Sequence, residues 1–146
     1  MGLPAPSAEA ATFVVTKETD DDGACTVDDC ALREAVQAAN STPGMDTIVL
    51  PGGTYQLSLV GPVEENFNMT GDLDIADDVE ILGDEDASVT IGGDGTDRVL
   101  QTFDSVVMID GVTLTGGAGC CGGGHPRFRW ECDDIEQRNS HQRRVW

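Results

Sequence analysis

The feature that most constrains the fold of this chain is a phrase of alternating aliphatic residues that returns along its second half. Residues 79–83 (Val-Glu-Ile-Leu-Gly) are echoed 28 positions later by residues 107–111, and residues 89–93 (Val-Thr-Ile-Gly-Gly) are echoed 23 positions later by residues 112–116. Alternation puts every second side chain on one face of a strand. Recurrence over about 20–30 residues is typical of a solenoid, in which each repeat packs only against its neighbours. The pattern therefore predicts a mainly β fold, a parallel β-helix with short strands in every repeat.

A β-sandwich is the structural alternative. It would need longer strands and two-residue hairpin turns such as Asn-Gly, and no Asn-Gly dipeptide occurs in the sequence. The hairpins of a sandwich pair antiparallel, whereas the rungs of a β-helix pair in parallel. Strand direction therefore distinguishes the two hypotheses.

One short helix is expected over residues 30–40, ahead of the repeats. Its apolar residues recur at i, i+3, i+4 and i+7 and so form one hydrophobic face: Leu32, Ala35, Val36 and Ala39. Asp28 or Asp29 is expected to cap its start, and Asn40, with Pro43-Gly44 behind it, to end it. Further strands are expected where β-branched and aromatic residues concentrate or alternate with acidic ones: residues 12–16, 47–50, 54–59 and 73–75.

Two cysteines lie immediately before this helix. Cys25 and Cys30 are spaced to close a small loop, and a disulfide there would stabilise the fold by roughly 2 kcal/mol through chain entropy. Such a bond implies an oxidising compartment; two free, buried thiols are the alternative. Arg33 follows Asp29 by four positions, which predicts a surface ion pair of about 0.3–0.5 kcal/mol.

The cysteine and helix block has the features of a known family. Cys25, the run 30–36 (Cys-Ala-Leu-Arg-Glu-Ala-Val), the following Gln-Ala-Ala-Asn40 and residues 48–55 (Ile-Val-Leu-Pro-Gly-Gly-Thr-Tyr) resemble the CSLREA domain, with Ala31 in place of the family's serine. The resemblance covers residues 12–119. It implies the start of a right-handed parallel β-helix of the pectin-lyase-like class, secreted or at the cell surface of bacteria or archaea. It also implies an N-terminal fragment, because relatives continue for many more rungs.

Within that resemblance, the helix is expected to act as a cap. The first rung of a β-helix exposes unpaired N–H and C=O groups, and an amphipathic helix laid over this end would bury its apolar face, chiefly Leu32 and Val36, on the aliphatic ladders. The expected capping residues are Leu32, Arg33, Glu34, Ala35, Val36, Ala39 and Asn40. The family lends no catalytic residues, so none are expected here.

The charge of the chain restricts the kinds of partner that it can bind. A formal net charge of −19 disfavours binding to nucleic acids and to anionic membranes, because both partners would be repelled. Membrane insertion is not expected, because no apolar run approaches about 18 residues. Its self-repulsion would be offset by high ambient salt in a halophilic protein or by bound calcium; an ordinary acidic surface is the alternative. No resident cofactor is expected, and the weak calcium candidates, which match no defined motif, are Asp84, Asp86, Asp94 and Asp97.

Two functions fit these features. The first is a non-catalytic, adhesin-like scaffold with cell-surface glycans or proteins as partners. The second is the remnant of a polysaccharide lyase or hydrolase, in which Asp72 and Asp74 on one strand face would act near Asp77 and Asp78. Acidic residues on outer faces are more often solvated surface, and Arg98 is the sole basic residue of the repeats.

The two ends of the sequence differ from its middle. Residues 1–11 are expected to be a signal remnant or a disordered N-terminus, without the apolar core of a signal peptide. Residues 120–146 hold 5 of the 8 basic residues and both tryptophans, which is typical of a frameshifted or small basic tail that is disordered. Its zinc-type side chains have no standard spacing: Cys120, Cys121, His125, Cys132 and His141.

Overall fold

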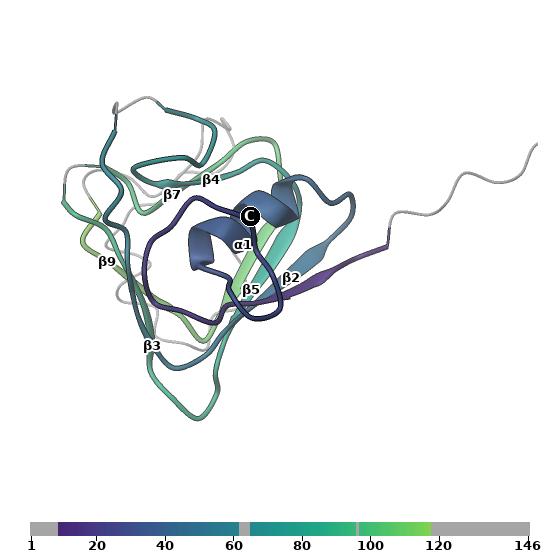
Figure 1. Cartoon of the computed structure of the whole chain (residues 1–146), viewed down its shortest axis with the longest axis horizontal. Coiled ribbons are helices and arrows are strands. Elements are labelled where there is room, and N and C mark those ends of the chain that lie inside the picture. Colours follow the sequence, from purple (N-terminus) through teal and green to yellow (C-terminus); the bar gives the residue numbers. More distant parts are fainter. Residues whose placement is uncertain (1–8, 62–64, 96, 118–146) are drawn as a thin grey trace, which may run out of the picture.

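A computed structural model describes residues 9–61, 65–95 and 97–117 of the 146-residue chain (Figure 1). The predicted tail 120–146, with its zinc-type side chains, lies outside these residues, as do the first eight positions. The described residues carry the cysteine pair, the helix and the aliphatic repeats.

Within the described residues, nine strands and one helix are present. The elements are β1 (Thr12–Val14), α1 (Leu32–Asn40), β2 (Asp46–Leu50), β3 (Gly53–Gln56), β4 (Leu73–Ile75), β5 (Val79–Gly83), β6 (Val89–Gly92), β7 (Leu100–Thr102), β8 (Val107–Asp110) and β9 (Thr113–Thr115). The mainly β class with one helix is therefore confirmed.

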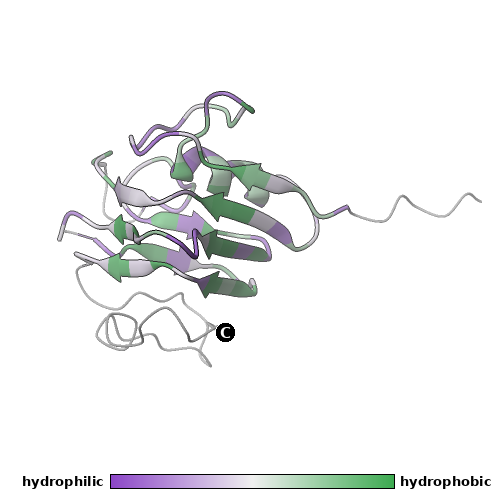
Figure 2. Cartoon of the chain, turned by 90° about the horizontal axis from the view of Figure 1, so that it is seen from below, coloured by the Kyte–Doolittle hydropathy of each residue, from purple (hydrophilic) through white to green (hydrophobic). Residues whose placement is uncertain are grey.

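The strands form three sheets, and the chain visits them in a fixed rotation. The orders are β1-β2-β5-β8 in sheet A, β3-β6-β9 in sheet B and β4-β7 in sheet C. Every pairing among the described strands is parallel, so the antiparallel sandwich is wrong. Figure 1 shows the three sheets on different sides of the molecule, and Figure 2 shows their strands stacked in layers.

The register explains why the aliphatic phrase repeats. Ile48, Ile81 and Ile109 are in-register neighbours across β2, β5 and β8, and all three lie in the core. Side chains at one register position of parallel strands point to the same face, so each repeat adds one aliphatic side chain to a continuous column. The core therefore grows by stacking like residues.

The glycines that close the repeated phrase have a packing cause. A Cβ on Gly83 would lie 2.2 Å from the carbonyl oxygen of Gly111, and a Cβ on Gly93 would lie 2.6 Å from that of Gly116. Gly111 and Gly116 also adopt φ of +69°, a conformation that side chains disfavour. Neighbouring turns therefore approach too closely for any other residue.

Three strand expectations need correction. The strand expected over residues 12–16 ends at Val14, because Thr16 exchanges hydrogen bonds with Cys30. β7 was not expected, because Leu100–Thr102 is three residues long and lacks an alternating aliphatic pair. The strand expected over residues 54–59 ends at Gln56, because the N–H groups of Ser58 and Leu59 donate to the carboxylate of Asp20 instead of to a neighbouring strand.

The helix lies against β1, β2 and β4 (Figure 1). It buries the expected apolar face. Its N-cap is Ala31, in extended conformation with φ −78° and ψ 162°. The expected capping by Asp28 or Asp29 is wrong, because the turn that links Thr26 to Asp29 ends before the helix begins. Glu34, in the first turn of the helix, supplies a capping hydrogen bond instead: its Oε2 accepts the N–H of Ala31 at 2.7 Å.

Candidate functional site

The disulfide that the sequence predicted is present. Cys25 and Cys30 are joined, with an S–S distance of 1.99 Å and Cα atoms 4.2 Å apart. Cys30 is also held to Thr16, two residues beyond β1: its N–H donates to Thr16 Oγ1, and its carbonyl accepts the N–H of Thr16, both at 2.8 Å. The bonded loop therefore fastens the start of α1 to the first strand of sheet A.

Arg33 is fully buried, with 0% of its side chain exposed, against an aspartate with a 2% exposed side chain. Its Nε lies 2.7 Å from Asp20 Oδ1, and its Nη2 lies 2.9 Å from Asp20 Oδ2, a two-point pairing of guanidinium and carboxylate. The predicted surface pair with Asp29 is wrong. Asp29 is exposed and bonds Lys17 at 2.6 Å, whereas Arg33 points into the interior of the cap.

The remaining donors of Arg33 reach backbone carbonyls at the start of β4. Nη1 donates to the carbonyl of Asp72 at 3.1 Å, and Nη2 to that of Gly71 at 2.7 Å. β4 is the first strand of sheet C. One guanidinium therefore satisfies two carbonyls at the beginning of this sheet. Through Asp20 it also holds residues 18–24, the acidic loop, at the same time.

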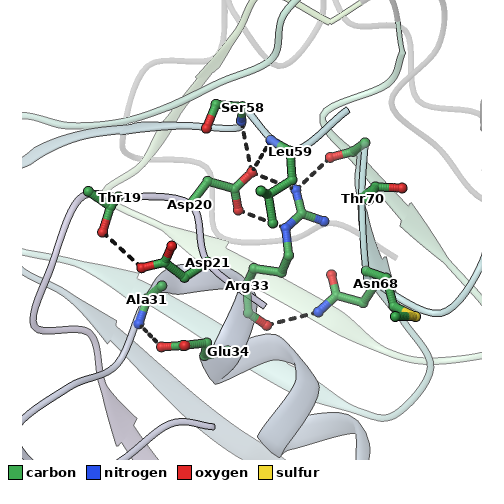
Figure 3. A network of polar contacts seen from close by, with 12 residues as sticks. Thr19, Asp20, Asp21, Ala31, Arg33, Glu34, Ser58, Leu59, Asn68 and Thr70 are labelled. Atoms are coloured by element: carbon green, nitrogen blue, oxygen red, sulfur yellow. Dashed lines mark hydrogen bonds and ion pairs between the residues drawn. The ribbon is translucent and has the colours of Figure 1, made fainter. Parts of the chain in front are cut away.

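The acidic loop does the same for sheet B. Asp20 Oδ2 accepts the N–H of Ser58 at 2.8 Å and that of Leu59 at 3.0 Å (Figure 3). Glu18 Oε2 accepts the N–H of Thr54, in β3, at 3.0 Å. β3 is the first strand of its sheet, so two carboxylates take N–H groups on this strand and just beyond it.

Asn40 joins the end of the helix to β4. Its Nδ2 donates to the carbonyl of Asp74 at 2.8 Å, and its Oδ1 accepts the N–H of Ala76 at 2.8 Å. A side-chain amide that bonds one carbonyl and the N–H two residues later reproduces the pattern of a neighbouring parallel strand. In sheet A, Asp46 Oδ1 accepts the N–H of Ala11 at 2.8 Å, just before β1.

Glu34 is the second buried charged residue of the helix, with 4% exposure. Its Oε1 accepts the N–H of Gly23 at 3.0 Å, and Lys17 Nζ lies 3.7 Å from its Oε2. Lys17 also bonds Asp21 at 2.8 Å. The hydrogen bonds that Lys17 donates to Asp21 and Asp29 hold the pKa of Lys17 well above its usual value, and the ammonium lowers the pKa of Asp21.

Asp72 and Asp74 are buried, which overturns the expectation of a solvated acidic face. They are 0% and 1% exposed. Asp72 Oδ2 lies 3.1 Å from Arg98 Nε, and Asp74 Oδ2 accepts the N–H of Asn68 at 2.9 Å. Asn68, itself buried, also donates from Nδ2 to the carbonyl of Arg33 at 2.8 Å, so it covers β4 and connects it to the helix.

Burial dominates the acid–base properties of this pair. It raises the pKa of Asp74 to about 7. The hydrogen bond from the backbone N–H of Asn68 partly opposes this shift, and the charge of Asp72 reinforces it. Burial also raises the pKa of Asp72, with the charge of Asp97 in the same direction and Arg98 opposing. Two neighbouring carboxyl groups with raised pKa values resist simultaneous ionisation.

The calcium candidates lie in turns where local hydrogen bonds use part of their oxygens. Asp84 Oδ1 accepts the N–H of Asp86 at 2.9 Å, and Asp97 Oδ1 accepts the N–H of Arg98 at 2.8 Å. Asp94 also has an interaction partner. In residues 9–61, 65–95 and 97–117, no three His, Cys, Asp or Glu side chains are arranged to hold a metal ion, and calcium binding stays a prediction.

The structure brings together all seven expected capping residues and adds three that the sequence did not single out. Leu32, Ala35, Val36 and Ala39 are buried, and Arg33, Glu34 and Asn40 make the polar contacts. The additional residues are Glu18, Asp20 and Asn68. Glu18 and Asp20 belong to an acidic run that reads as an ordinary loop, and nothing near Asn68 in the sequence signals its burial.

No family model, curated protein or solved structure matches the chain. The resemblance to the CSLREA domain therefore stays a prediction. The part of the chain that the structure describes contains no helix long and apolar enough to cross a membrane.

Proposed function

We propose that this chain is the capped N-terminal part of a right-handed parallel β-helix, a non-catalytic scaffold of the CSLREA type that is exported to the cell surface or beyond. One observation carries the proposal: side chains take hydrogen bonds at the first strands of sheets B and C, where a preceding strand would otherwise pair. Unpaired strand edges recruit other chains. A sealed first rung lets a long repeat begin in water without aggregating.

The rotation of the chain through three parallel sheets supports the β-helix. β2, β3 and β4 are followed by β5, β6 and β7 in the same sheet order, and then by β8 and β9. Parallel strands of one sheet are joined by right-handed crossovers in about 98% of cases, which favours the right-handed form. The in-register columns of like side chains also suit this arrangement.

The disulfide and the charge support export and a surface role. A disulfide at Cys25–Cys30 is favoured outside the reducing cytosol. A net charge of −19 favours solubility at high salt and selects against polyanionic partners. Glycans or proteins of the cell surface are the partners that this proposal expects.

The compartment can be tested on the protein in its source cells. Cells would be treated with an alkylating reagent before lysis, and the protein would then be digested with trypsin. Cleavage after Lys17 and Arg33 releases residues 18–33, which contain both cysteines of the pair and no other cysteine. We expect this peptide to be unmodified and bonded. An alkylated peptide would place the protein in a reducing compartment and contradict export.

A polysaccharide-degrading enzyme is the second candidate, favoured by one observation: the pKa of Asp74, at about 7, suits a general acid. Burial of Asp72 and Asp74 opposes it, because a sugar would need direct access to both carboxyl groups. The full chain and its Asp74→Asn variant would be incubated with acidic and neutral polysaccharides, with reducing and unsaturated ends measured. We expect no turnover by either protein; turnover by the wild type that the variant loses would establish the enzyme.

A further inference from the structure

Three buried oxygens on and beside β4 have no hydrogen-bond partner. They are Oδ1 of Asp72, Oδ1 of Asp74 and Oε1 of Gln101. A buried acceptor without a partner loses its bonds to water without replacement, which disfavours the folded state. Such a concentration in one small region needs an explanation.

The three residues belong to one surface of sheet C. Asp74 of β4 and Gln101 of β7 are in-register partners, so their side chains leave the same face of strands that lie about 4.8 Å apart. Asp72 precedes Asp74 by two positions and shares this face. A proton on Asp74 Oδ1 would have Gln101 Oε1 within reach as its acceptor.

The charged and polar groups around the pair come from every element packed against it. They are Glu65 and Asn68 of the covering segment, Asp97, Arg98 and Gln101 on the side of β7, and Arg33 and Asn40 of α1. Arg33 is neutralised by Asp20. Three further carboxylates lie near Asp74, those of Glu65, Asp72 and Asp97. Arg98 is therefore the cation available to them, and it bonds Asp72 directly.

We propose that Asp72 and Asp74 hold one proton between them at neutral pH, and that this proton latches the segment 65–71 and the helix cap onto sheet C. Asp74 carries the proton, because Arg98 favours the ionised form of Asp72. The O–H group of Asp74 donates to Gln101, while its other oxygen keeps the bond from Asn68. Loss of the proton leaves two adjacent buried anions.

The latch acts through Asn68. This residue exchanges two hydrogen bonds with Asp74, at 2.9 and 3.2 Å, and donates a third to the carbonyl of Arg33. The carbonyl of Asp74 in turn accepts from Asn40 of the helix. Repulsion at the aspartate pair therefore strains the contacts that join the covering segment, the helix and the first strand of sheet C.

The test measures stability against pH in the full chain. A carboxyl group whose pKa is higher in the folded state favours folding at low pH, and this contribution declines as pH rises from its unfolded to its folded pKa. Denaturation midpoints would be recorded from pH 5 to pH 9 for the wild type, for Asp74→Asn and for Glu85→Gln, which removes an exposed carboxylate. The side-chain amide that Asp74→Asn introduces would keep a donor for Gln101 at every pH.

We expect the wild type and Glu85→Gln to lose stability together as pH rises from 5 towards 7 and to level off above 7, and Asp74→Asn to lack this decline. An equal decline in all three proteins would overturn the proposal. Carbon NMR of the aspartate carboxyl groups in the wild type provides a measurement that does not need the variant to fold. One resonance titrating near pH 7 supports the shared proton, and the absence of any such resonance refutes it.

Discussion

The capping region and the repeating strands differ in which groups form hydrogen bonds with their backbone N–H and C=O groups. Between the strands, backbone groups bond to backbone groups, and the buried side chains are aliphatic, as in the column Ile48–Ile81–Ile109. In the cap, backbone groups bond to carboxylates, a guanidinium and an amide, and Arg33 and Glu34 are themselves buried. A sheet can be extended by adding another strand of the same pattern, whereas the cap depends on a unique set of side-chain partners.

The two regions also differ in how their contributions to stability are distributed among residues. Each aliphatic column spreads its contribution over several equivalent residues. The cap concentrates it, because Arg33 alone bonds Asp20 and two carbonyls of another segment. We therefore expect substitutions to have local, moderate effects in the strands and larger effects at a few positions of the cap.

Removing the guanidinium gives the largest expected effect. Arg33→Met should lower the free energy of unfolding by about 3–5 kcal/mol, because it leaves the buried carboxylate of Asp20 without its cation. Urea denaturation of the full chain provides the measurement. Arg33→Lys is the matched control: it keeps the charge without the planar fork and should recover part of the loss. A loss below about 1 kcal/mol in Arg33→Met would show that the cap tolerates an open edge.

An aliphatic truncation tests the repeating strands. Ile81→Ala, in the middle of its column, should cost about 2–4 kcal/mol through lost burial and the cavity that remains. The control is Leu82→Ala on the outward, half-buried face of the same strand, for which we expect a clearly smaller loss. Equal losses at both positions would contradict the assignment of inward and outward faces, and a loss at Ile81 above that of Arg33→Met would reverse the comparison.

The smallest expected effect is a gain. Ala31 occupies the N-cap with extended dihedral angles but no side-chain acceptor, while Glu34 already bonds its N–H. Ala31→Ser should complete the capping box and add about 1 kcal/mol of stability. Thermal denaturation would measure this gain, with Ala87→Ser, in an exposed turn, as the control. If Ala31→Ser is destabilising, the buried N-cap has no room for the hydroxyl group.

The aliphatic alternation, the helical face and the cysteine spacing were enough to predict most strands, the helix and the disulfide. These features are local: each depends on residues within a few positions of one another. The partners of Arg33 were mispredicted because helical spacing pointed to Asp29, whereas the structure selects Asp20. A spacing rule holds for exposed side chains and fails once the side chain turns inward.

The sequence by itself determined that this chain stacks short strands behind one amphipathic helix, because period-two and period-3.6 patterns are imposed by backbone geometry. Only the tertiary structure decided which polar groups are buried together. Asp20, Asn68 and Asp74 look like surface residues in the sequence, yet they bond groups 6 to 39 positions away. Burial depends on which distant segments cover a residue, and no local pattern encodes that.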